Sequence, residues 1–229
     1  MSPEKPAAIL AEARATRSPL RGLYAITDSQ LMVGEMLLAK SEAALRGGCR
    51  LLQYRDKQAA PERQLQQARQ LRALCDRYGA CLVINDNVEL ALAVGADGLH
   101  IGQTDAPLLQ VLARVREQAG ERMRVGISCH GDLALAQQAE ADGADYVAFG
   151  RFFPSRTKPA APPADPVVLQ QARTCLSLPL VAIGGITRDN APRLIDLGAD
   201  MVAVIHELFA PDDLDEIEQR ARDFTHLFS

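Results

Sequence analysis

Short runs of apolar and often β-branched residues recur along the whole chain. These runs predict eight β-strands, at residues 23–27, 51–55, 81–86, 98–102, 124–129, 146–150, 180–184 and 201–205. Between them lie amphipathic stretches with apolar residues at helical spacing. These stretches predict helices at residues 30–47, 62–78, 108–118, 133–141, 167–176 and 190–197. The pattern therefore predicts strands and helices that alternate along the chain.

The predicted strands are apolar on both faces, as is typical of parallel strands covered by helices. Eight such strands within 229 residues predict an α/β fold, a closed (β/α)8 TIM barrel. An open doubly wound sheet is the alternative, but residues 26–29 lack the glycine-rich loop usually found after the first strand of such sheets. We expect one barrel domain at residues 22–229, preceded by a short N-terminal extension at residues 1–21 that could form a helix.

Composition narrows the class of protein further. Hydrophobic residues make up 48% of the chain but aromatic residues only 4%, which predicts an aliphatic core. A net charge of -4 argues against binding to nucleic acid. The five cysteines include no Cys-x-x-Cys pair, so reduced thiols are expected. Without an apolar run long enough for a membrane span or signal peptide, we expect a cytoplasmic protein with no membrane partner. The sequence is compatible with a homo-oligomer.

Three Gly-Ala-Asp triplets stand between a predicted helix and the next predicted strand, at residues 95–97, 143–145 and 198–200. Glycine at this position commonly ends a helix in the left-handed conformation. The triplets would lie at the amino ends of the strands, whereas active sites of such barrels lie at the carboxyl ends. We therefore interpret them as part of the scaffold.

Polar side chains gather directly after the predicted strands, at the end that forms the mouth of such barrels. Gln53, Arg55 and Lys57 alternate, so they point the same way in an extended segment and favour binding of an anion. Asp86 and Asp105 follow neighbouring strands, which lie about 4.8 Å apart. Both carboxylates could therefore bind one magnesium ion. The alternative is that each of them caps the following helix.

Other strand ends indicate a second anion site and two structural histidines. Gly184 and Gly185 follow the seventh strand, where the loops of these barrels commonly bind phosphate. Two anion sites predict a pocket for two phosphorylated substrates. His100 lies within the fourth strand and is interpreted as a hydrogen-bonded barrel residue. His130, one step beyond Ser128 and Cys129, is interpreted as a loop residue in preference to a catalytic one.

Six motifs, taken together and in this order, resemble the thiamine phosphate synthase family over about residues 23–209. They are Gln-Tyr-Arg-Asp-Lys at 53–57, Ile-Asn-Asp at 84–86, Gly-Leu-His-Ile-Gly-Gln-Thr-Asp at 98–105, Ser-Cys-His at 128–130, Ser-Arg-Thr-Lys at 155–158 and Ala-Ile-Gly-Gly-Ile at 182–186. The resemblance implies a magnesium-dependent transferase. Its substrates would be 4-amino-5-hydroxymethyl-2-methylpyrimidine diphosphate and 4-methyl-5-(2-hydroxyethyl)thiazole phosphate, and its products thiamine phosphate and pyrophosphate.

The resemblance also implies a role for each matching residue. The pyrimidine diphosphate would be bound by Gln53, Arg55, Lys57, Asn85, Ser128 and Lys158. The catalytic residues that stabilise the leaving diphosphate would be Arg55, Lys57 and Lys158, and Mg²⁺ would be held by Asp86 and Asp105. The thiazole phosphate would be bound by Ser155, Thr157, Gly185, Ile205 and His206. On that side the chain carries Arg151, Ser155 and His206 where the family commonly has Pro, Thr and Ser.

Two alternatives for the function stay open. A thiazole tautomerase-like isomerase would transfer a proton through a histidine such as His130 and would need no magnesium site. A non-catalytic binder of thiamine phosphates would need the pocket but not the leaving-group cations. Lys57 and Lys158, together with the two aspartates, argue against the tautomerase, because a tautomerase has no diphosphate to bind.

Overall fold

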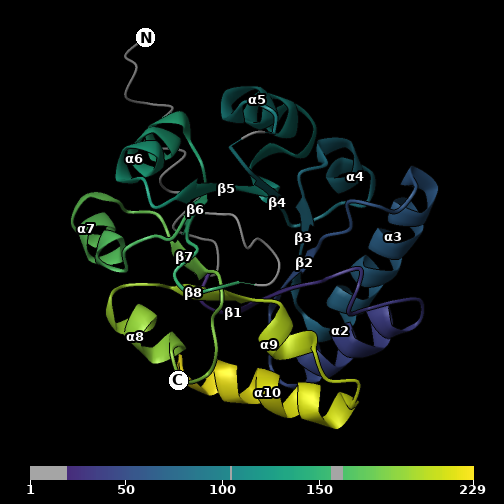
Figure 1. Cartoon of the computed structure of the whole chain (residues 1–229). Helices are drawn as coiled ribbons and strands as arrows, with labels where there is room; N and C mark the ends of the chain where they lie inside the picture. The colour runs from purple at the N-terminus through teal and green to yellow at the C-terminus, as the bar shows by residue number, and fades with distance from the viewer. Residues whose placement is uncertain (1–19, 104, 156–161) are drawn as a thin grey trace.

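The computed structural model of the chain describes residues 20–103, 105–155 and 162–229. Within these ranges eight parallel strands form a closed barrel, surrounded by helices (Figure 1), which confirms the (β/α)8 prediction. Each strand pairs with the next, and β8 pairs back with β1. The strands are β1 (Gly22–Ile26), β2 (Leu51–Tyr54), β3 (Cys81–Asn85), β4 (Gly98–Ile101), β5 (Arg124–His130), β6 (Tyr146–Phe149), β7 (Leu180–Ile183) and β8 (Met201–Val204).

Seven of the predicted strands run one residue too far, because the chain turns out of the sheet at that residue. At Asp86, Gly150 and Gly184 the backbone φ is 61°, 151° and 104°, values outside the β region. The exception is β5, which continues to His130 with an irregular register between Ser128 and His130. The strand ends therefore break where the polar side chains begin.

The helices include all six that the apolar spacing predicts. They are α2 (Met36–Arg46), α3 (Pro61–Tyr78), α4 (Val88–Ala93), α5 (Leu108–Ala119), α6 (Leu133–Asp142), α7 (Val167–Cys175), α8 (Ala191–Asp196), α9 (His206–Phe209) and α10 (Leu214–His226). The first predicted helix begins at Met36 instead of residue 30, because the Asp28 carboxylate accepts hydrogen bonds from the Gln30 and Leu31 amides in a turn. Helices α4, α9 and α10 were not predicted.

Helix α10 completes the ring of helices around the barrel by packing against α2. The two helices approach so closely that a Cβ atom on Gly47, the residue that follows α2, would lie 2.3 Å from the Glu218 carbonyl oxygen. The apolar residues of α10 that face this contact, Ile217, Ala221 and Phe224, are fully buried. The last strand and first helix of the barrel are therefore joined through the C-terminal helix.

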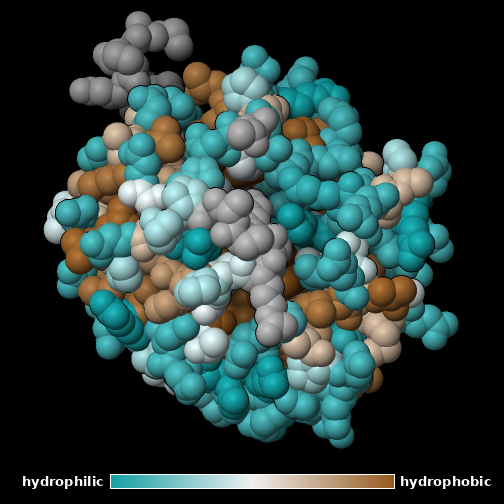
Figure 2. All heavy atoms as spheres, in the orientation of Figure 1, coloured by the Kyte–Doolittle hydropathy of each residue, from teal (hydrophilic) through white to brown (hydrophobic). Residues whose placement is uncertain are grey.

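Apolar side chains form two separate layers. The larger one lies between the barrel and its helices and includes Leu52, Leu82 and Leu99. The smaller one fills the barrel interior and includes Tyr24, Tyr146 and other residues from the strands. Figure 2 shows a largely hydrophilic surface on the face viewed there. No helix in the described part of the chain is long and apolar enough to cross a membrane.

The three Gly-Ala-Asp turns lie at the amino ends of β4, β6 and β8, as predicted for scaffold. Gly95, Gly143 and Gly198 end their helices with φ of 59°, 102° and 109°. Each aspartate accepts a hydrogen bond from the first or second amide of the preceding strand and pairs with an arginine of the helix before that strand. The sets are Asp97 with Leu82 and Arg72, Asp145 with Val125 and Arg116, and Asp200 with Leu180 and Arg173.

The helix expected in the N-terminal extension falls on residues 1–19, which lie outside the described residues. The first strand begins at Gly22.

Candidate active site

A cavity of about 380 Å³ lies at the carboxyl ends of the strands, and every strand of the barrel contributes to its lining. All the predicted site residues that the structure describes line this one cavity. They are Gln53, Arg55, Lys57, Asn85, Asp86, Asp105, Ser128, Ser155, Gly185, Ile205 and His206. Thr157 and Lys158 lie outside the described residues. The barrel therefore brings together residues that are more than a hundred positions apart in the sequence.

Gln53 lies in β2 and Arg55 and Lys57 follow it, and all three alternating residues face the cavity, as predicted. The backbone amide of Arg55 donates to Thr27 Oγ1 at 2.9 Å, which fixes the start of this segment against β1. Within the described residues, the Arg55 guanidinium has no hydrogen-bonding or ion-pair partner. Lys57 Nζ lies 2.7 Å from Asp86 Oδ2, with just over half of the lysine side chain exposed. Both cations can therefore contact a ligand in the cavity.

The two predicted metal-binding aspartates do not cap helices, so the capping alternative is wrong. Asp86 Oδ2 accepts from Asn85 Nδ2 at 2.6 Å, and the N-cap of α4 is the next residue, Asn87, whose side chain accepts from the Leu90 amide. Asp105 Oδ2 accepts from the Gly102 amide at 2.7 Å, within its own loop. Both carboxylates are therefore held by the loops after β3 and β4 and line the cavity.

The donor set fits magnesium. Asp86 and Asp105 supply carboxylate oxygens to one cavity. Among the described residues no group of three or more His, Cys, Asp or Glu side chains could hold a metal ion on its own. Mg²⁺ typically takes one or two carboxylates and completes its shell with water and phosphate oxygens, whereas a zinc site needs three or four protein ligands. A two-carboxylate site beside cations suits a metal that arrives with a phosphate.

On the opposite side of the cavity, the loops after β6 and β7 pack tightly against each other. Gly184 and Gly185 both have positive φ, and a Cβ atom on Gly185 would lie 2.4 Å from the Pro154 carbonyl oxygen. A Cβ atom on Gly184 would lie 2.3 Å from the Cβ of Arg151. The glycine pair is therefore required by the contact between two loops, a reason that the sequence did not reveal. That contact places Ser155 and Gly185 along the same cavity wall.

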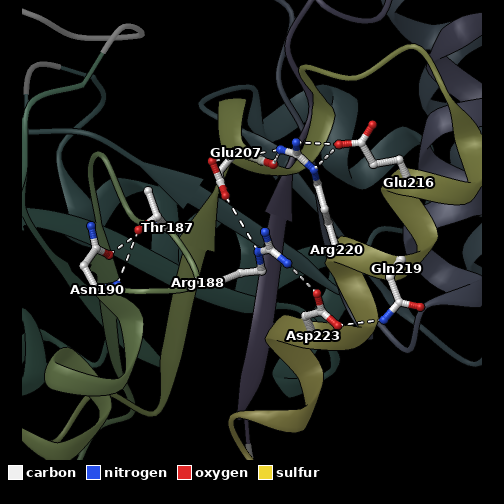
Figure 3. Close-up of polar contacts among 8 residues, drawn as sticks. All are labelled: Thr187, Arg188, Asn190, Glu207, Glu216, Gln219, Arg220 and Asp223. Atoms are coloured by element: carbon white, nitrogen blue, oxygen red, sulfur yellow. Dashed lines mark hydrogen bonds and ion pairs between the residues drawn. The ribbon is translucent and has the colours of Figure 1, made fainter.

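Glu207 also lines this wall and was not predicted. Its carboxylate lies 3.9 Å from Arg188 Nε and 4.0 Å from Arg220 Nη1, and Arg220 also donates to the Glu207 backbone carbonyl. Figure 3 shows Glu207 reached by both arginines, with Arg188 also paired to Asp223. Arg220 pairs more closely with Glu216, at 2.6 Å, so three carboxylates share two guanidinium groups and the network is not charge-balanced.

The floor of the cavity is a buried chain of hydrogen bonds that crosses the barrel. Gln53 Nε2 donates to the Tyr24 hydroxyl at 2.7 Å, and the Tyr24 and Tyr146 hydroxyls lie 3.1 Å apart. Tyr146 Oη lies 3.1 Å from His100 Nδ1, and His100 Nε2 lies 2.9 Å from Ser128 Oγ. Burial raises the pKa of both tyrosines well above its ordinary value. His100 is thus a hydrogen-bonded barrel residue, as predicted.

Tyr24 and Tyr146 were missed by the sequence reading. Their strands are apolar on both faces, so alternation could not tell which side chains point into the barrel. The only signal was the tyrosine hydroxyl itself, because a buried hydroxyl needs a hydrogen-bonding partner.

The two residues after Ser128 lie in different surroundings. Cys129 is buried in the outer core, and burial raises the pKa of its thiol to about 12. His130 is exposed at the cavity wall with φ of 53°, and its carbonyl accepts from the Gly150 amide at 2.8 Å. His130 thus ends β5 and does not lie in a loop, and its non-catalytic role stays a prediction.

A closed (β/α)8 barrel with a polar cavity at the carboxyl ends of its strands defines the class of TIM-barrel enzymes. A family model for thiamine monophosphate synthase matches residues 23–208, and the chain belongs to this family. A thiamine-phosphate synthase of Alcanivorax borkumensis is 52% identical over 209 residues, covering 91% of this chain and 94% of that protein. The chain is thus a homologue of a thiamine biosynthesis enzyme of the transferase class, which confirms the resemblance.

Two solved structures support the same assignment of the fold. A thiamine phosphate pyrophosphorylase from Pyrococcus furiosus superposes with a TM-score of 0.79 at 30% identity, over 90% of this chain and 95% of that one. A thiamine phosphate pyrophosphorylase from Bacteroides thetaiotaomicron has a TM-score of 0.64 at 16% identity, over 90% and 96% of the two chains. The second likeness concerns the fold alone.

Proposed function

We propose that the chain is a magnesium-dependent thiamine phosphate synthase. It would condense 4-amino-5-hydroxymethyl-2-methylpyrimidine diphosphate with 4-methyl-5-(2-hydroxyethyl)thiazole phosphate to thiamine phosphate and release pyrophosphate. The observation that carries the proposal is that Arg55 and Lys57 line one cavity with the carboxylates of Asp86 and Asp105. A site that combines two cations with two metal-binding oxygens suits a diphosphate and its metal.

In this proposal the β2–β5 side of the cavity binds the pyrimidine diphosphate. The Arg55 guanidinium, which can bind two phosphate oxygens at once, and the Lys57 ammonium contact the diphosphate. Lys158 from the loop after β6 adds a third cation. The remaining contacts come from Gln53, Asn85 and Ser128, which line the same side. Asp86 and Asp105 hold Mg²⁺, which when bound neutralises charge on the diphosphate oxygens and so makes diphosphate a better leaving group.

The β6–β8 side binds the thiazole phosphate through Ser155, Thr157, Gly185, Ile205 and His206. Support for this division comes from the glycine pair after β7, which lines the cavity and adds no side chain there. The serine hydroxyl and backbone amides can donate to phosphate oxygens. The two substrates then lie on opposite walls of one cavity, with their reacting atoms between them.

The reaction needs no side chain to remove a proton from the nucleophile. The lone pair of the thiazole nitrogen forms the new C–N bond to the pyrimidine methylene carbon, while the C–O bond to diphosphate breaks and its electron pair leaves with the diphosphate. Arg55, Lys57 and Lys158 stabilise that developing negative charge. Positioning and electrostatics are then sufficient for catalysis. The inert environment of Cys129 agrees with this mechanism, since no covalent intermediate is required.

The proposal extends to the organisation of the chain and its surroundings. Residues 22–229 form a single catalytic domain that follows an N-terminal extension, and the enzyme works in the cytoplasm on two small phosphorylated heterocycles. Neither nucleic acid nor a membrane takes part. A homo-oligomer is compatible with this function, because all the residues assigned to the site come from one chain.

The decisive experiment mixes the purified chain with both substrates and Mg²⁺ and measures thiamine phosphate and pyrophosphate. We expect the two products in equal amounts, and no product when the thiazole phosphate is omitted or the metal is chelated. A tautomerase-like isomerase and a non-catalytic binder both predict no pyrophosphate. Absence of product with both substrates present would therefore refute the proposed function.

A further inference from the structure

The hydrogen-bonded chain at the cavity floor depends on one glycine. His100 of β4, Gly126 of β5 and Tyr146 of β6 lie side by side in the strand register. A Cβ atom on Gly126 would lie 2.0 Å from the Tyr146 ring. Because Gly126 has no side chain, the Tyr146 ring lies over β5 and reaches the His100 ring, with centroids 5.6 Å apart and an interplanar angle of 25°.

The Gln53 donor, together with the need of each buried hydroxyl for an acceptor, favours one direction of donors and acceptors along this chain. Gln53 Nε2 is a donor, so the Tyr24 oxygen accepts from it. The proton of the fully buried Tyr24 hydroxyl then needs an acceptor, and Tyr146 Oη at 3.1 Å is the partner that the structure records. Tyr146 in turn donates its own proton to His100 Nδ1. Both phenols keep their protons, because burial raises their pKa values.

An Nδ1 atom that accepts a hydrogen bond carries no proton, so the proton of the neutral ring is on Nε2. That Nε2–H donates to Ser128 Oγ at 2.9 Å. Since the Ser128 oxygen accepts from His100, its hydroxyl proton is available to a ligand in the cavity that Ser128 lines. The backbone of Ser128 is also held, because its carbonyl accepts from Gln103 Nε2 at 2.6 Å.

We propose that His100 is a positioning residue, locked by Tyr146 as the neutral Nε2–H tautomer so that the Ser128 hydroxyl acts as a hydrogen-bond donor to the cavity. The ligand that this arrangement selects is one that presents a hydrogen-bond acceptor to Ser128. The identity of that ligand as the aminopyrimidine rests on the proposed function. The tautomer itself is a property of the enzyme without substrates.

The tautomer is measured by nitrogen NMR on the full-length protein labelled at histidine, near pH 7 and without substrates. The His100 signals are identified by their loss in His100→Gln. We expect one ring nitrogen with the shift of an unprotonated, hydrogen-bonded Nδ1 and the other with that of a protonated Nε2. An Nδ1–H tautomer or a doubly protonated ring would overturn the proposal. This result does not depend on whether the chain makes thiamine phosphate.

The matching variant is Tyr146→Phe, which keeps the ring and removes the hydroxyl between Tyr24 and His100. We expect the fixed tautomer to be lost and the KM for the pyrimidine diphosphate to rise about tenfold, the effect of one hydrogen bond, with the thiazole phosphate KM unchanged. Tyr54→Phe is the control, because the Tyr54 hydroxyl donates to Gln67 Oε1 outside the barrel at 2.7 Å. An unchanged tautomer in Tyr146→Phe, or an equal rise of both KM values, would contradict the positioning role.

Discussion

Aspartates lie at both ends of the barrel, and their surroundings differ. At the amino ends, the carboxylates of Asp97, Asp145 and Asp200 each accept from a strand amide and pair with an arginine of a neighbouring helix. At the carboxyl ends, the partners of Asp86 and Asp105 among the described residues lie in their own loops, apart from the cavity residue Lys57. The same side chain thus joins elements at one end and faces a cavity at the other.

The difference follows from where each carboxylate stands relative to the sheet. Before a strand, the carboxylate reaches the amide that opens the neighbouring strand, and the arginine from the covering helix completes its shell. After a strand, the chain turns out of the sheet, as the φ of 61° at Asp86 shows. The carboxylate then does not reach the amide that opens a neighbouring strand. Aspartates of the first kind should therefore matter for stability and those of the second kind for activity.

The largest effect is expected when both carboxyl-end aspartates are neutralised. The double variant Asp86→Asn with Asp105→Asn should lower kcat/KM by about 10³-fold, near 4 kcal/mol, because the proposed metal site loses both of its anionic ligands. The variant should unfold at nearly the same urea concentration as the parent chain. Measuring both quantities in the two-substrate assay tests the comparison. Full activity in the double variant would refute the assignment of Asp86 and Asp105 as metal ligands.

The next effect concerns the cavity cation that pairs with Asp86. Lys57→Ala should slow turnover by about 10²-fold, near 3 kcal/mol, since one donor to the leaving group is lost. Stability should change by less than about 1 kcal/mol, because just over half of the Lys57 side chain is exposed. Lys57→Arg is the control that keeps the charge and should recover part of the rate. A defect in Lys57→Ala confined to the thiazole phosphate KM would contradict its role.

At the amino ends the expectation is reversed. Asp145→Ala should destabilise the fold by about 2–4 kcal/mol, because it leaves the Val125 amide without its acceptor in a nearly buried position and removes one of the acceptors of Arg116. The activity of each folded molecule should stay the same. Urea unfolding combined with active-site titration separates the two. A loss of turnover without a loss of stability would mean that the two ends are not independent.

The smallest difference lies among the amino-end aspartates themselves. Only 4% of the Asp145 side chain is exposed, against 35% for Asp200 and 41% for Asp97. Water can replace part of the lost contacts at the more exposed positions, so Asp200→Ala and Asp97→Ala should each destabilise the fold about 1 kcal/mol less than Asp145→Ala. Equal unfolding midpoints for the three variants would show that burial does not set the strength of these turns.

The positions of the strands could be predicted because a parallel barrel needs two-sided apolar runs, and such runs are visible in one dimension. The short helix α9 was missed because its four residues are too few to show an apolar period. Helix α4 was missed although α8, which also has six residues, was predicted. Helix α10 was missed although it is long. Its role as the partner of α2 arises from a contact between the two ends of the chain, with Gly47 against Glu218.

The candidate site was predictable where residues follow a strand directly. Gln53, Arg55 and Lys57 were identified from alternation, and Asp86 and Asp105 from their position after neighbouring strands. Glu207 was missed because its relevance depends on Arg188 and Arg220, which come from a loop and a helix that only the folded chain brings to it. Ion pairs among residues distant in the sequence leave no local pattern.

The sequence by itself determined the alternation of strands and helices, the closed barrel and the set of polar residues at the strand ends, because these depend on local periodicity and on chain order. Only the tertiary structure decided which buried side chains face into the barrel and which residues they contact. Tyr24, His100 and Tyr146 meet because closure of the barrel brings β1, β4 and β6 around one interior, where each buried polar group must find a partner.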